Sequence, residues 1–261
     1  MKLAFMSSVM PKAALADLLA QGTKHGYQGI EFRPEWSQAH GVELTASAKE
    51  RKAVRKKLAE GGLDPCCLAP GIRFHEDEPG KRDAQLELLN RHIQLAADVG
   101  IGRVRVFADP LPNKGAGLRS ANLAAQADYL ARGAVKAHAL GIRLVLETHA
   151  NCRAADVAEI LWRAAYPPGL WINWHLAHCL NHGEDVDEAY RHVKGRVAHV
   201  HFALSAEKHE DISYIIRQAQ LLAWEGYDGY FSVEAINPPD SDMAMKTHAD
   251  GWKKILAAIG R

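Results

Sequence analysis

Short apolar runs alternate along the chain with longer segments in which apolar residues recur at helical spacing. The runs are short enough to be buried strands, and the segments between them read as amphipathic helices. This alternation is typical of a parallel sheet with crossover helices. We expect strands at residues 2–6, 29–32, 66–69, 104–107, 144–146 and 171–174, in the run that ends at His201, and at residues 231–233.

The segments between the runs carry helix start and stop signals. Pro favours the first turn of a helix and Gly its C-terminal end. We expect helices from Pro11 to near Gly22 and at residues 46–60, 81–99, 123–140, 154–165, 186–193, 212–224 and 243–259. The alternation therefore predicts the α/β class and one (β/α)8 TIM barrel, a single domain over residues 1–261, because such a barrel usually takes ~250 residues.

Four of the later runs end in side chains that can bind a metal ion. The C-terminal ends of barrel strands meet around one mouth, where TIM-barrel enzymes keep their chemistry. Imidazole nitrogens and carboxylate oxygens are common ligands of divalent cations. The sequence thus predicts that one group of side chains converges at the mouth: Glu147, His175, His201 and Glu234.

Composition and charge narrow the class of partner. The chain has 48% hydrophobic and 24% charged residues, and 32 Lys and Arg balance 31 Asp and Glu. Without a basic excess, neither nucleic acid nor an anionic membrane is an expected partner. No apolar run approaches the ~20 residues of a membrane span.

The cysteines and the N-terminus bear on the compartment. Cys66, Cys67, Cys152 and Cys179 match no CxxC metal pattern. Reduced thiols in a cytoplasmic enzyme are the expected state, since cytosolic proteins rarely keep disulfides. The apolar run at the N-terminus is broken by Ser7 and is expected to form the first strand rather than a secretory signal.

At these residues the chain resembles a known family, the xylose isomerase-like sugar isomerases and epimerases. The resemblance lies in Glu147, in the pair His175-x-x-His178, in His201 and in Glu234. It covers essentially the whole chain, including the motifs Gly29-Ile30-Glu31 and Gly183-Glu184-Asp185. In that family a Glu, an Asp, a His and a Glu from strands five to eight hold one divalent metal, and the His three residues after the Asp touches substrate.

One ligand position departs from the family pattern. His175 stands where the family usually has Asp, and Phe202-Ala203-Leu204 follows His201 where the family has Lys-Asp. We expect one divalent ion, Zn, Mn, Co or Ni. The additional imidazole favours Zn, Ni or Co over Mg or Mn, because nitrogen ligands suit these ions better.

The resemblance implies a metal-dependent isomerase or epimerase of a keto-sugar or sugar phosphate, which moves a proton through an enediolate. Glu147 and Glu234 are the expected acid/base pair as well as ligands, with His175 and His201 completing the metal site. His178 falls on the substrate-contacting position. The expected partner is a small carbohydrate, and the expected assembly states include a homo-oligomer.

Two further residues are predicted to bind substrate. Glu31 ends the second strand, where an ion pair with Arg33 or Arg73 is an equal alternative. His149 follows Glu147 by two residues, and orienting a metal ligand is the alternative role there.

Other features could shape the substrate pocket. The loops at residues 74–80 and 109–117 follow strands three and four and are candidate lids. Candidate phosphate-binding cations are Arg33, Arg73 and Lys114. Aromatic residues that could line a sugar pocket, or simply pack in the core, are Trp36, Phe74, Phe107 and Trp174.

Three other functions compete with this interpretation. A dehydratase or lyase acting on a polyol ketone would share the first proton abstraction. A degenerate, non-catalytic sugar-binding barrel would explain His175. An endonuclease IV-like nuclease fits poorly, because it needs extra metal ligands where strand three offers Cys67 and Ala69, and no Asp-x-His follows His201.

Overall fold

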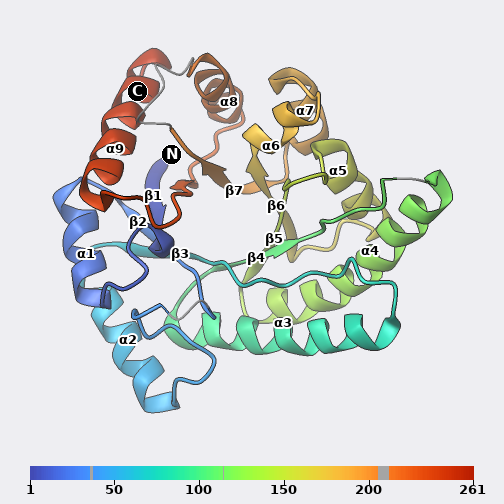
Figure 1. The fold of residues 1–261 in the computed structure, drawn as a ribbon, viewed down its shortest axis with the longest axis horizontal. Helices are drawn as coiled ribbons and strands as arrows, with labels where there is room; N and C mark the ends of the chain where they lie inside the picture. Colours follow the sequence, from blue (N-terminus) through green and yellow to red (C-terminus); the bar gives the residue numbers. More distant parts are fainter. Residues whose placement is uncertain (36–37, 114, 205–211) are drawn as a thin grey trace.

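Eight parallel strands close into a barrel in the computed structural model, which describes residues 1–35, 38–113, 115–204 and 212–261 (Figure 1). Neighbouring strands pair in sequence order, and β1 pairs with β8 to close the cylinder. The predicted (β/α)8 TIM-barrel fold is therefore confirmed. The strands are β1 Lys2–Met6, β2 Gly29–Phe32, β3 Asp64–Leu68, β4 Arg103–Phe107, β5 Arg143–Glu147, β6 Leu170–His175, β7 Val197–Phe202 and β8 Tyr230–Val233.

Helices surround the barrel and cover the outer faces of the strands (Figure 1). They are α1 Leu15–Lys24, α2 Ala48–Glu60, α3 Pro79–Val99, α4 Ala116–Ala139, α5 Ala154–Arg163, α6 Leu176–Asn181, α7 Val186–Val193, α8 Ser213–Trp224 and α9 Ser241–Ala258. In the described part of the chain, no helix has both the length and the apolar character that crossing a membrane requires.

Two helices begin more than two residues away from their predicted starts. The 3-10 turn Ser7–Val9 follows β1, and Ala13 N–H donates to the Met10 carbonyl, so Pro11 lies inside a turn and α1 starts only at Leu15. In contrast, α4 starts at Ala116, within the loop expected to be a lid. Tertiary contacts hold this early turn: Arg119 pairs with Asp156 of α5 at 2.7 Å.

The short helix α6 was not predicted. It begins directly after β6 and contains His178, which the sequence placed near the metal site. Glu184, one of the residues that carried the resemblance, accepts hydrogen bonds from the backbone N–H groups of Ala154 and Ala155 at 2.8 and 3.0 Å. A carboxylate at a helix N-terminus satisfies free N–H groups and complements the helix dipole. Glu184 therefore fixes the start of α5.

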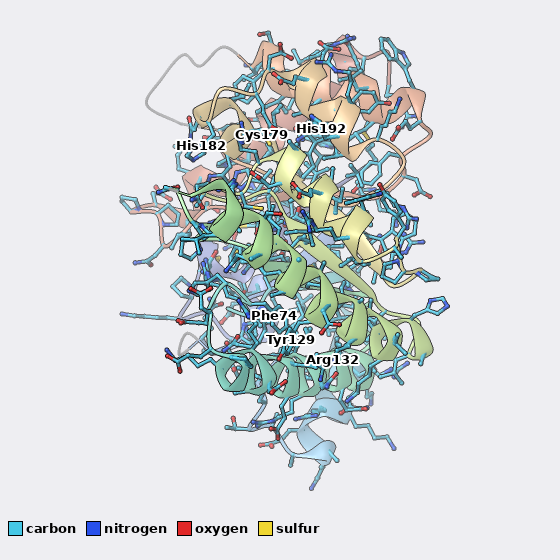
Figure 2. All side chains as sticks on the ribbon, turned by 90° about the vertical axis from the view of Figure 1, so that its right-hand side faces the viewer. Phe74, Tyr129, Arg132, Cys179, His182 and His192 are labelled. Carbon is cyan, nitrogen blue, oxygen red and sulfur yellow. The ribbon has the colours of Figure 1, made fainter. Side chains whose placement is uncertain are left out.

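The apolar core has two parts. The larger cluster lies between the strands and the helices, and Phe74 and Trp174 belong to it. Figure 2 shows Phe74 beside Tyr129 of α4. The two rings are stacked with their centroids 5.6 Å apart, and the Arg132 guanidinium lies over the Tyr129 ring. Phe74 and Trp174 are fully buried, so they pack in the core rather than line a sugar pocket.

The smaller cluster fills the interior of the barrel below the strand ends that form the mouth. It draws residues from β1, β3, β5, β7 and β8, strands that only the inside of a closed barrel brings together: Ala4, Cys66, Cys67, Val145, Ala198 and Tyr230. All four cysteines of the chain are buried and free. Burial raises the pKa of the Cys67 thiol, with the nearby Glu31 charge acting in the same direction.

Candidate metal centre

The structure brings the four predicted ligand residues together at the mouth of the barrel. Glu147 and His175 are the last residues of β5 and β6, His201 is the next-to-last residue of β7, and Glu234 directly follows β8. Each offers one ligand atom, and these atoms all lie within 4.8 Å of one another. Strand ends that are far apart in sequence thus form one compact group.

Glu147 lies deepest in this group. It is fully buried, and its register partner on β6 is Asn173, two residues before His175. Because side chains on one face of a strand repeat every second residue, Glu147 lies one layer below His175. Its Oε1 is 2.9 Å from Nδ1 of His201 and 3.3 Å from Nδ1 of His175, and Oε2 accepts a hydrogen bond from Nη1 of Arg105 at 3.1 Å.

These contacts set the charges of the group. Burial alone would raise the pKa of Glu147, but the charges of His201 and Arg105 and the hydrogen bonds from His175 and His201 outweigh it, so the pKa lies well below its usual range. Burial opposes the charged form of His201 too, yet the Glu31 and Glu147 carboxylates raise its pKa well above the ordinary value. Each carboxylate therefore favours the charged form of the imidazole beside it, and the imidazole favours the charged form of the carboxylates.

Glu234 differs from Glu147 in its access to the mouth. Its side chain is 14% exposed, whereas that of Glu147 is 0% exposed. Oε2 of Glu234 lies 3.4 Å from Nδ1 of His175 and 3.9 Å from Nδ1 of His201. Of the two predicted acid/base residues, Glu234 is the one that solvent reaches.

Two further histidines form the rim above the group. The His178 ring lies 4.3 Å from His175 and 4.6 Å from His149, measured between ring centroids. Nδ1 of His149 is 2.8 Å from Oδ1 of the buried Asp109, and its side chain is 24% exposed. Burial, with the nearby His175 and His149, lowers the pKa of His178 to about 4, so this ring is neutral at pH 7 and offers one donor and one acceptor nitrogen.

Glu31 lies beside the group but contacts other partners than those expected from the sequence. It is fully buried on β2. Oε2 lies 2.9 Å from Nε2 of His199, and both oxygens lie 3.0 Å from Nε2 of His201. Burial would raise its pKa, but the charges and hydrogen bonds of His201 and His199 lower it well below the usual range. Glu31 therefore accepts hydrogen bonds from two imidazoles.

His199 and Arg105 also belong to this network, although the sequence did not single them out. His199 stands two residues before His201, so strand alternation places both on the inner face of the barrel. Arg105 likewise alternates with apolar residues of β4, and its Nη2 also donates to the Ala69 carbonyl at 3.0 Å. Period-two alternation was the signal that could have found both residues.

The candidate phosphate-binding cations are engaged in different ways. Arg33 is buried, and burial together with the charge of Arg105 lowers its pKa to about 10. Nε of Arg73 donates to the Asp109 carbonyl at 3.2 Å, and its guanidinium lies 4.1 Å from the Phe107 ring centre. Lys114 lies outside the described residues, as does Trp36 among the aromatic candidates.

The donor set fits a divalent metal ion. Two ligands at ~2.2 Å from one ion cannot lie more than about 4.4 Å apart. The four ligand atoms, all within 4.8 Å, therefore need only small shifts to share one ion. Two carboxylates and two imidazoles are also a chemically suitable set for Zn and its neighbours in the first transition row.

Residues 19–258 match the family model of the xylose isomerase-like TIM barrel. The chain belongs to this family. No protein of curated function matches the sequence at a significant level. Membership of the family agrees with the closed barrel of the structure.

Solved structures with the same fold are similar over nearly the whole chain. A D-psicose 3-epimerase has 15% sequence identity and a TM-score of 0.80, with 100% of both chains covered. The IolI protein, crystallised with a zinc atom, has 16% identity and a TM-score of 0.76, with 99% of this chain and 98% of that chain covered. The probable 3-DHS dehydratase AsbF from Bacillus anthracis has 15% identity and a TM-score of 0.74, with 97% and 99% covered.

Proposed function

We propose that this protein is a metal-dependent isomerase or epimerase of a keto-sugar or sugar phosphate. The convergence of Glu147, His175, His201 and Glu234 within 4.8 Å at the barrel mouth carries this proposal. The epimerase among the similar structures supports the carbohydrate class, and the zinc-containing one supports a divalent ion. We assign one ion to the site, Zn, Mn, Co or Ni.

In this proposal the four residues hold the ion, which when bound would polarise the substrate carbonyl and stabilise negative charge on its oxygen. Glu234 is the acid/base residue more accessible to a substrate in the mouth, because its side chain is partly exposed whereas that of Glu147 is buried. Glu147 approaches from the opposite side of the barrel, as the second acid/base residue of the pair. The charges of His201 and Arg105 and the hydrogen bonds from His175 and His201 outweigh the effect of burial and favour the ionised form, which can accept a proton.

The rim histidines would bind and orient the substrate. His178 is neutral at pH 7 and can donate to one hydroxyl oxygen while accepting from another. His149 is held by Asp109, so its Nε2 has a fixed direction. Positioning of this kind places the carbon-bound proton near a carboxylate before transfer.

A dehydratase acting on a polyol ketone is the second candidate, favoured by the similarity to AsbF. Both reactions begin with removal of a proton beside a carbonyl. They differ in the next step, because a dehydratase expels a hydroxyl group whereas an epimerase or isomerase returns the proton.

One experiment tests both candidates. The purified protein is incubated with a panel of ketoses and ketose phosphates in deuterated water, with Zn, Mn, Co or Ni added in turn. Deuterium incorporation at one carbon with an isomeric product supports the isomerase or epimerase, and an unsaturated product supports the dehydratase. No exchange with any sugar or metal would contradict both and favour the non-catalytic barrel.

A further inference from the structure

The His201 imidazole bridges two buried carboxylates. Nδ1 lies 2.9 Å from Oε1 of Glu147 and 3.9 Å from Oε2 of Glu234, so this nitrogen faces the candidate metal centre. Nε2, on the other side of the ring, lies 3.0 Å from both oxygens of Glu31. All atoms of this bridge are inaccessible to solvent except those of Glu234.

Metal coordination fixes where the proton of this ring must lie. A coordinating imidazole nitrogen carries no proton, so a neutral ring keeps its proton on the other nitrogen. If Nδ1 of His201 coordinates, Nε2–H points at Glu31 and donates to it. A carboxylate in this position selects the tautomer, holds the ring plane and increases the basicity of the coordinating nitrogen.

Glu31 is itself held in place. Nε2 of His199 lies 2.9 Å from Oε2 of Glu31, and His199 stands two residues before His201 on the same face of β7. The carboxylate on β2 therefore accepts from two imidazoles of one strand across the barrel. Both oxygens of Glu31 lie on the Nε2 side of the His201 ring, whereas the candidate metal centre lies on its Nδ1 side, so the ring stands between Glu31 and a sugar bound at that centre.

We propose that Glu31 is a positioning residue, which fixes the ring and tautomer of His201 for metal binding instead of contacting substrate. The inference rests on the proposed metal centre. It replaces the substrate-binding role expected from the sequence with a role exerted through His201.

A competing arrangement has to be separated from this one. Glu31, Cys67 and His199 also offer ligand atoms within 4.8 Å of one another, so they could hold an ion of their own. In that case Glu31 would be a ligand. The hydrogen-bonding distances from both Glu31 oxygens to imidazole nitrogens favour the positioning role, and the number of bound ions distinguishes the two.

The test compares metal binding by the wild type, Glu31→Gln and Cys67→Ala. Gln keeps the shape of the side chain but removes its charge. Cys67 is the control because it is the register partner of Glu31 on β3 and is equally buried. Zn affinity is measured by competition with a chelator, and Co binding by visible absorption, which reports the ligand geometry.

We expect Glu31→Gln to bind Zn about 10–100-fold more weakly than the wild type and to show an altered Co spectrum, since loss of a partner that orients a ligand typically has this effect. Cys67→Ala should bind one ion with wild-type affinity and spectrum. Glu31→Asp keeps the charge but shortens the reach to His201, so it should also bind more weakly and serves if the Gln variant does not fold.

Three outcomes would overturn the inference. Unchanged affinity and spectrum in both Glu31 variants would remove the positioning role while leaving the proposed function intact. Two ions per wild-type chain, one of them lost in Cys67→Ala, would make Glu31 a ligand. No binding by the wild type would refute the metal centre itself, and the positioning role with it.

Discussion

Nδ1 of His201 lies 2.9 Å from Oε1 of Glu147, although the two residues are on β7 and β5, two strands apart in the barrel. A contact between non-adjacent strands is made through the barrel interior. Both side chains are fully buried, so the pair is shielded from solvent. Three of the four residues of the candidate metal centre lie within strands, and Glu234 directly follows one.

Replacing Glu234 should separate catalysis from folding. We expect Glu234→Gln to lower turnover by about 10²–10⁴-fold, the usual contribution of a positioned acid/base group, while the circular dichroism spectrum is retained. The measurement is the rate of isomerisation of the substrate found by deuterium exchange. The matched control is Glu159→Gln on α5, whose partner is Arg163 at the surface. Equal rates for the wild type and Glu234→Gln would exclude the acid/base role.

Restoring the acid at the unusual ligand position should change metal preference. His175→Asp exchanges an imidazole nitrogen for a carboxylate oxygen, so affinity for Mn should rise relative to Zn. The ratio of the two dissociation constants is measured by competition titration. His182→Asp makes the same substitution just after α6 and should leave the ratio unchanged. A constant ratio in His175→Asp would show that His175 is not a ligand.

Arg105 should matter most when no metal is bound. It is 1% exposed and donates to Glu147, so Arg105→Met leaves a buried carboxylate with one cation fewer. Breaking a buried pair in this way typically costs about 3–5 kcal/mol. Urea unfolding with a chelator should show this loss, and added Zn should recover part of it by supplying positive charge near Glu147.

The comparison is a surface arginine. Arg132 is 51% exposed and pairs with Asp128 at 3.7 Å, so Arg132→Met should cost at most about 1 kcal/mol. If both variants lost the same stability, the buried pair would have no special role in the folded protein.

His40 should make stability depend on pH. Nε2 of His40 donates to the Arg33 carbonyl at 3.1 Å, and Nδ1 accepts from the Val42 N–H at 3.0 Å, which fixes a neutral ring. Burial lowers the pKa of His40 from 6.5 to about 4. The unfolded chain therefore binds this proton first, and stability is retained above pH 6.5 and lost as the pH falls from 6.5 towards 4.

A non-titrating variant isolates this effect from other groups. The free energy of unfolding is measured for the wild type and His40→Gln at pH 7.5 and pH 5. The difference in free energy of unfolding between the wild type and His40→Gln should be smaller at pH 5. Only the wild type has a side chain at position 40 that gains a proton on unfolding at this pH. An advantage that does not change with pH would contradict the shifted pKa.

Gly169 should not tolerate a side chain. A Cβ at this position would clash with the carbonyl oxygen of Ala134 in α4, so the backbone would have to move. We expect Gly169→Ala to lower the free energy of unfolding by about 1–3 kcal/mol, as overpacking does. Gly80 in α3 has no atom within 4 Å of its Cβ position, so Gly80→Ala should instead stabilise by about 0.5–1 kcal/mol. Thermal or urea unfolding of both variants checks the opposite signs.

Local patterns determined most of the fold and the identity of the candidate ligands. Apolar runs and helical spacing depend on neighbouring residues, so the eight strands were placed within one or two residues. The four candidate ligands could also be predicted from the sequence, because the C-terminal ends of the strands of a TIM barrel lie around one mouth. The starts of two helices were not predicted: a turn at Pro11 delays α1 to Leu15, and a contact between Arg119 and the distant Asp156 holds the first turn of α4.

Only the tertiary structure decided how deep each residue lies and which partner it has. The stagger of strands in a closed barrel sets which residues share a layer, and no local pattern encodes that stagger. It places Glu147 one layer below His175 and out of solvent, and leaves Glu234 partly exposed at the mouth. It also brings Glu31 of β2 against His201 of β7, a contact between residues 170 positions apart in the sequence.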